Sequence, residues 1–191
     1  LISEINKSLA VRVGVDEITV TRIQDFPKIG IRLTNISIDE SSSFYNEKLI
    51  QADELNLFVN LIELYQGKYV IDEISIRGGI LNVVDHGNSN NYEIIKSSND
   101  KKSANVSFEI DQLKLLNCDI KYNHTSSKTK INGFISSSNI QLKYNEASTF
   151  LKIKSDFKNL YLLVNNDNYI NDKNVFLNTK FTLNTNLKTF K

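Results

Sequence analysis

The sequence has few of the residues that usually cross-link or interrupt a fold. It contains one cysteine, one proline, no methionine and no tryptophan in 191 residues. A single cysteine excludes an internal disulfide, and the position of Cys118 among strand residues favours a small buried side chain. No apolar run approaches the roughly 18 residues that a membrane-spanning helix needs. Because the chain opens at Leu1 without a methionine, we expect one domain, residues 1–191, cut from a longer protein.

The sequence also has no large excess of charge of one sign, since it contains 23 basic and 22 acidic residues. The basic residues are scattered singly, so we expect no nucleic-acid partner. His86 and His124 lack the spaced partners of a zinc site, and His124 is expected to be solvated. No phosphate-binding loop, dinucleotide-binding glycine pattern or nucleophile motif is present. We therefore expect a protein that is not an enzyme, with no catalytic residue, metal ligand or cofactor.

Two pairs of adjacent carboxylates, Asp16-Glu17 and Asp72-Glu73, resemble acid–base pairs. Neighbouring residues of a strand point to opposite faces, so neither pair can act as one unit. We expect both pairs to have structural roles where strands begin.

The sequence does contain a repeated six-residue pattern: an apolar residue, a polar residue, Glu, Asn or Gln, Ile or Leu, any residue, and an aliphatic residue. The copies are Val15–Val20, Leu33–Ile38, Ala52–Leu57, Ile71–Ile76, Ile110–Leu115, Phe157–Leu162 and a degraded Ser137–Leu142. The first four begin 18, 19 and 19 residues apart, and the fifth follows after 39. Such spacing predicts a meander of hairpins, each one strand out and one strand back. Alternatively, any amphipathic strand that follows a polar turn has this appearance.

Alternation of apolar and polar residues predicts about a dozen strands with little helix. Residues 1–10 have the spacing of the end of a helix, and residues 96–104 are expected to form a flexible loop. A short helix is predicted over Leu61–Gly67, with Asn60 as its N-cap and Gly67 as its stop. A hairpin turn is predicted at Gly78-Gly79, where positive φ is cheap.

The predicted fold is mainly β, a twisted antiparallel meander with one dry face and one wet face. The sheet could close on itself as a sandwich or barrel, or curl into an open trough whose apolar lining is covered by a ligand. Spacing alone favours neither. A dozen strands would span about 55–60 Å. The candidate lining residues are Leu55, Leu57, Val59, Ile74, Ile76, Leu81, Val83, Leu113, Leu115, Ile120, Tyr122, Ile140, Leu142, Leu160 and Leu162.

One stretch resembles the N-terminal region of the AsmA family. Its elements, in the order of that family, are Phe26-Pro27, Ile31–Ile38, Ile50–Val59, Leu61–Gly67, Val70–Ile76, Gly79–Val83 and Gly87–Tyr92. Leu113–Tyr122 is similar to the recurrent strand–turn–strand of the same family. Tyr92 stands where the family often has tryptophan, and the anchor helix that normally precedes the region is absent or reduced to Ile2–Leu9.

The resemblance implies a bacterial envelope protein with a periplasmic β-groove, anchored to the inner membrane by an upstream helix. Relatives are similar to bridge-like lipid-transfer proteins, so the implied partners are phospholipid acyl chains, the membrane and other envelope proteins. The implied function is transfer of phospholipid between the inner and outer membranes. Eukaryotic chorein-type proteins share the groove and remain an alternative family. A structural or assembly module with a self-closed β core is the alternative function.

Overall fold

The computed structural model describes residues 11–22, 26–40, 48–66, 70–92, 109–144 and 148–184. The helical end expected within residues 1–10, the loop expected at 96–104 and the helix stop at Gly67 lie outside the described residues. Within the described residues, no helix combines the length and the apolar character needed to cross a membrane.

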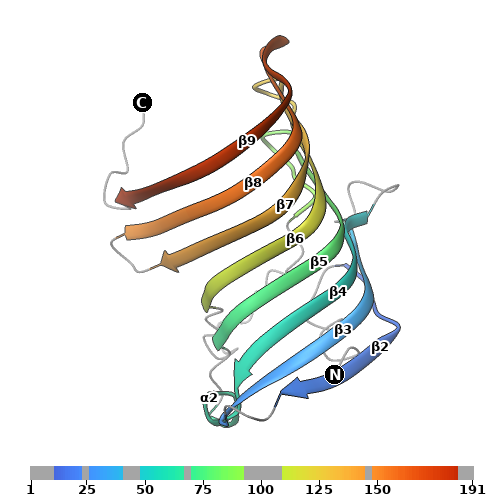
Figure 1. Ribbon diagram of the computed structural model, residues 1–191, viewed down its shortest axis with the longest axis vertical. Helices are drawn as coiled ribbons and strands as arrows, with labels where there is room; N and C mark the ends of the chain where they lie inside the picture. Colours follow the sequence, from blue (N-terminus) through green and yellow to red (C-terminus); the bar gives the residue numbers. More distant parts are fainter. Residues whose placement is uncertain are drawn as a thin grey trace.

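The described chain forms nine strands and one short helix, so the prediction of a mainly β fold is confirmed (Figure 1). The strands are β1 (Val13–Gly14), β2 (Glu17–Arg22), β3 (Lys28–Asp39), β4 (Lys48–Asn60), β5 (Val70–Asp85), β6 (Glu109–His124), β7 (Thr129–Tyr144), β8 (Ser148–Val164) and β9 (Asp167–Asn184). The helix, α2, spans Leu61–Tyr65. Its first turn is capped as predicted, because the Asn60 Oδ1 accepts hydrogen bonds from the Ile62 and Glu63 amides at 3.0 and 3.4 Å.

All nine strands belong to one open, twisted sheet, with β1 and β2 beside β3 at one edge and β9 at the other (Figure 1). Strands β3 to β9 follow one another in sequence order. Every pairing is antiparallel except that of β5 with β6, which is parallel. The meander prediction is therefore correct in strand order and wrong at this one junction. A parallel pairing requires a crossover of a dozen or more residues, which explains the doubled spacing before the fifth repeat.

The predicted number of strands is too high because several predicted turns lie inside continuous strands. The hairpin at Gly78-Gly79 is wrong, since β5 runs unbroken from Val70 to Asp85. The alternation also predicts strand ends at Leu115, Ile135 and Phe157, whereas strands β6, β7 and β8 continue through these positions. Each of the seven repeat copies consequently falls on a different strand, from β2 to β8. The repeat unit is one strand with its turn, and not a hairpin.

One line of facing positions crosses β3 to β7 where the pairing is interrupted on every strand without a shift of register, and we call it the bulge line. Its members are Asn35, Asp53, Gly78, Asn117 and Ser136. Asn35, Gly78 and Asn117 have φ of 49°, 57° and 53°. Glycine and asparagine are the residues that adopt this left-handed conformation at the lowest cost. At Gly78 a side chain is also blocked, because its Cβ would lie 2.1 Å from Asp53 Oδ2.

The bulge line determines which side chains share a face. In an uninterrupted strand, residues on one face are two positions apart. Across the bulge line the buried residues are three apart, as in Leu33 and Ile36 of β3 and Leu115 and Cys118 of β6. Because each of these strands has one extra residue at the line, the apolar side chains of both halves of a strand stay on one side of the sheet, and the register between the strands is unchanged. Cys118 is buried among them, as predicted.

Candidate functional site: the apolar face

Directly opposed residues on neighbouring strands project from the same side of a sheet, so the register defines rows of side chains that cross it. One row, on the β3 to β9 strands, is Leu33, Leu55, Ile76, Leu115, Ser138, Ser155 and Leu177. The next row is Ile31, Leu57, Ile74, Leu113, Ile140, Ile153 and Thr179. Seven strands at about 4.8 Å spacing make each row about 29 Å long. This apolar face is about half as long as a dozen strands would have made it.

All fifteen candidate lining residues lie on the apolar face. Eight belong to one packed cluster: Leu55, Leu57, Ile74, Ile76, Leu81, Leu113, Leu115 and Ile120. The other seven join it through their cross-strand neighbours: Val59, Val83, Tyr122, Ile140, Leu142, Leu160 and Leu162. The sequence prediction missed contributions from both ends of the sheet, such as Ile36 of β3 and Phe181 of β9. The same period-two alternation marks those strands and was a sufficient signal for them.

Exposure on this face is lowest at the centre of the sheet and higher toward the strand ends and the edge strand β9, where Leu177 is 37% exposed. Leu115 and Ile135, beside the line, are 5% and 2% exposed, whereas Leu142 and Phe181, near the strand ends, are 42% exposed. The described residues provide no second layer over the sheet, because α2 packs mainly on β4. The apolar face is therefore partly accessible along its margins.

The opposite face of the sheet is polar and carries ion pairs between lysines and carboxylates. Lys28 pairs with Asp72 at 2.7 Å, and Lys114 pairs with Glu73 at 2.7 Å. Asp72 and Glu73 therefore lie on the same face, where the β4–β5 register shifts, so the expectation that neighbouring side chains point apart is wrong for this pair. Each carboxylate has its own lysine partner. Asp16 likewise accepts a hydrogen bond from Asn35 Nδ2 at 2.8 Å. The division into a dry face and a wet face agrees with the alternation in the sequence.

One polar pair interrupts the apolar face. Ser138 and Ser155, on β7 and β8, are 6% and 3% exposed, and their hydroxyl oxygens lie 2.5 Å apart. Each serine satisfies the other inside an apolar row. Nearby, burial raises the pKa of the Cys118 thiol, so this cysteine remains an uncharged packing residue.

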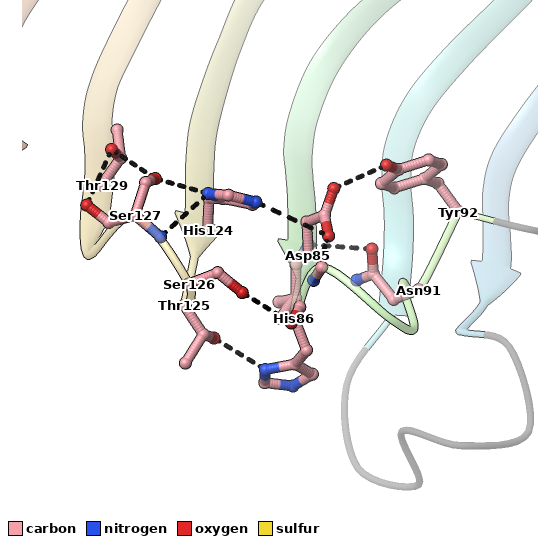
Figure 2. A network of polar contacts seen from close by, with 11 residues as sticks. Asp85, His86, Asn91, Tyr92, His124, Thr125, Ser126, Ser127 and Thr129 are labelled. Atoms are coloured by element: carbon pink, nitrogen blue, oxygen red, sulfur yellow. Dashed lines mark hydrogen bonds and ion pairs between the residues drawn. The ribbon is translucent and has the colours of Figure 1, made fainter. Parts of the chain in front are cut away.

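The apolar face ends in polar residues where β5 and β6 end and β7 begins (Figure 2). Val83, Tyr122 and Ile131 form the last apolar row there. Two residues further along each strand, on the same face, lies the row that we call the polar rung: Asp85, His124 and Thr129. His124 and Asp85 side chains are 26% and 21% exposed. Water and solutes can therefore reach the polar rung.

Hydrogen bonds fix the geometry of the polar rung (Figure 2). Asp85 Oδ1 accepts from the Gly87 amide at 2.6 Å, and Asp85 Oδ2 accepts from the Tyr92 hydroxyl at 2.8 Å. His124 Nε2 lies 3.9 Å from Asp85 Oδ1, and His124 Nδ1 contacts Ser127. The Gly87 amide, then the Tyr92 hydroxyl, lower the pKa of Asp85. Asp85 is therefore a carboxylate at neutral pH.

A buried asparagine holds the segment after β5 against that strand. Asn91 is fully buried; its Oδ1 accepts from the Val84 amide at 2.9 Å, and its Nδ2 donates to the Asn82 carbonyl at 2.8 Å. On the other side of the segment, His86 Nδ1 lies 2.7 Å from the Thr125 hydroxyl (Figure 2). The expectation that His124 is solvated is met only in part, because its side chain is 26% exposed but also contacts Ser127 of the β6–β7 turn and lies near Asp85. Period-two patterns carry no information about such turn-to-turn contacts.

Within the described ranges, no group of three or more histidine, cysteine, aspartate or glutamate side chains is placed to hold a metal ion. Comparison with protein-family models and with curated proteins finds no match for this chain.

Proposed function

We propose that the apolar face binds lipid acyl chains, and that the chain is a lipid-transfer module of an AsmA-like envelope protein. The supporting observation is the row of matched apolar side chains from Ile31 to Ile153 on six consecutive strands, β3 to β8, on a face that is accessible at its margins. The resemblance adds the setting: a periplasmic domain, anchored to the inner membrane by an upstream helix, that carries phospholipid toward the outer membrane. Partner envelope proteins belong to the same proposal.

The dimensions of the face suit an acyl chain. The hydrocarbon core of a bilayer is about 30 Å thick, so one leaflet supplies chains about 15 Å long. A face of about 29 Å by the length of a strand exceeds this in both directions. Each buried methylene contributes about 0.8 kcal/mol, so affinity comes from many contacts and from no single residue.

An exposed lining residue gives the sharpest test. Leu142 is 42% exposed, so Leu142→Asp places a carboxylate on the apolar face without burying it. We expect Leu142→Asp to fold normally and to lose much of its binding of a fluorescent fatty acid. Leu57→Ala should weaken this binding only mildly. Tyr161 is 37% exposed on the opposite face, and Tyr161→Asp is the matched control that should bind normally.

Equal binding by Leu142→Asp and Tyr161→Asp would contradict the choice of face. A structural module with a self-closed core makes a different prediction, because wild-type protein would then bind no fatty acid. Native mass spectrometry of the purified domain separates these outcomes, since it also detects lipid that copurifies.

A further inference from the structure

The polar rung gives the apolar face a direction. Along β5, β6 and β7 the face changes within two residues from Val83, Tyr122 and Ile131 to Asp85, His124 and Thr129. An amphiphile has the same arrangement of apolar tail and polar head. From Asp85 to the bulge line is seven residues, or about 23 Å, which accommodates an acyl chain of about 15 Å.

We propose that the polar rung is a head-group site that prefers a primary ammonium group, with Asp85 as its counter-ion. This inference rests on the proposed lipid binding and adds the chemistry of the ligand. A carboxylate offers about four acceptor positions, and the Gly87 amide and the Tyr92 hydroxyl occupy one on each oxygen of Asp85. An ammonium group therefore finds acceptor capacity on a side chain that is already oriented.

The charges around the rung favour a cation over an anion. Asp85 is anionic at neutral pH, because hydrogen bonds from Gly87 and Tyr92 lower its pKa. His124 Nε2 lies 3.9 Å from Asp85 Oδ1, and the hydroxyls of Ser127 and Thr129 lie 2.8 Å apart beside the imidazole. Lys128 follows in the β6–β7 turn and is a candidate source of opposing charge. If Lys128 dominated, an anionic head group would be preferred, so the choice of head group is a direct test.

Three lysophospholipids with one common acyl chain provide the test: ethanolamine, choline and glycerol head groups. Isothermal titration calorimetry of the wild-type chain should give the tightest binding for ethanolamine, by about two- to five-fold over glycerol, as for an exposed ion pair. Choline should bind more weakly than ethanolamine, because its methyl groups replace the N–H donors. Asp85→Asn should remove most of the preference for ethanolamine. Asp119→Asn, on the opposite face of β6, is the matched control and should retain it.

The outcomes separate the two proposals. Binding of all three lipids with equal affinity, or a preference for glycerol, would overturn the head-group site and leave lipid binding intact. Absence of binding for every lipid would overturn the proposed function itself. Circular dichroism establishes that Asp85→Asn is folded. If that variant does not fold, the order of the three wild-type affinities still decides the question.

Discussion

The bulge line makes a quantitative prediction at Asn117, whose φ is 53° and whose side chain is exposed. Left-handed backbone costs an ordinary residue about 1–2 kcal/mol, and a β-branched side chain tolerates it least. Asn117→Val should therefore lower the free energy of unfolding by about 2 kcal/mol. For a domain of this size, that corresponds to a fall in the melting temperature of about 4–8 °C. Asn117→Gly, which relieves the strain at an entropic cost, should change stability by less than about 1 kcal/mol.

Thermal unfolding followed by circular dichroism measures this series. The matched control is Lys121→Val, four residues along the same strand, where the side chain is exposed and φ is ordinary. Valine favours strands, so this control should be neutral or slightly stabilising. If Asn117→Val and Lys121→Val melt together, the left-handed residues do not hold the two halves of the strands in phase. The explanation of the common apolar face would then be refuted.

Three further outcomes are expected. Gly79→Ala should destabilise the sheet by about 2 kcal/mol or more in a urea titration, because its Cβ would lie 2.0 Å from the Gln51 carbonyl oxygen; a neutral result would mean that β4 and β5 can separate locally. Asn60→Ala should cost about 1 kcal/mol by removing the cap of α2, and Asn60→Asp should restore most of it in the same titration. The lowered pKa of Asp85 stabilises the fold above the unfolded-state value near 3.9, and this contribution disappears as the pH falls through the lower folded-state pKa. Wild-type protein should accordingly melt higher than Asp85→Asn at pH 7, with a smaller gap at pH 3; a gap independent of pH would contradict this.

The face of each residue could be predicted from the sequence because side-chain direction follows a period of two in any strand. The predicted faces are correct although the predicted number of strands is not, because the predicted strand ends lie close to the bulge line. At Gly78-Gly79 the sequence predicts a turn, and the structure has a left-handed residue, Gly78, inside a continuous strand. A turn and a left-handed residue at Gly78-Gly79 both shift the alternation of apolar and polar residues by one position. The residues on either side are therefore assigned to the correct face for a partly wrong reason.

The parallel pairing of β5 with β6 and the polar rung could not be predicted in this way. The pairing depends on a crossover between Tyr92 and Glu109, whose sequence has no apolar periodicity to indicate its path. The polar rung joins Asp85 to His124, which are 39 residues apart and become neighbours only through that pairing. Tyr92 reaches Asp85 because buried Asn91 holds the chain back against β5. Local patterns contain none of these relationships.

If the apolar face binds lipid as proposed, the sheet offers two different directions of movement. Along a strand, the apolar face changes to polar at the rung, so a lipid that lay in this direction would have a fixed orientation. Across the strands, the apolar rows continue for about 29 Å, interrupted by the Ser138–Ser155 pair. The polar margin itself crosses three of these strands, β5, β6 and β7, as the polar rung of Asp85, His124 and Thr129. A lipid that moves from strand to strand would therefore keep its tail on apolar side chains and its head group in water. A lipid that moved along a strand would bring its head group onto apolar side chains or its tail onto polar ones. Transfer on this surface should therefore proceed across the strands.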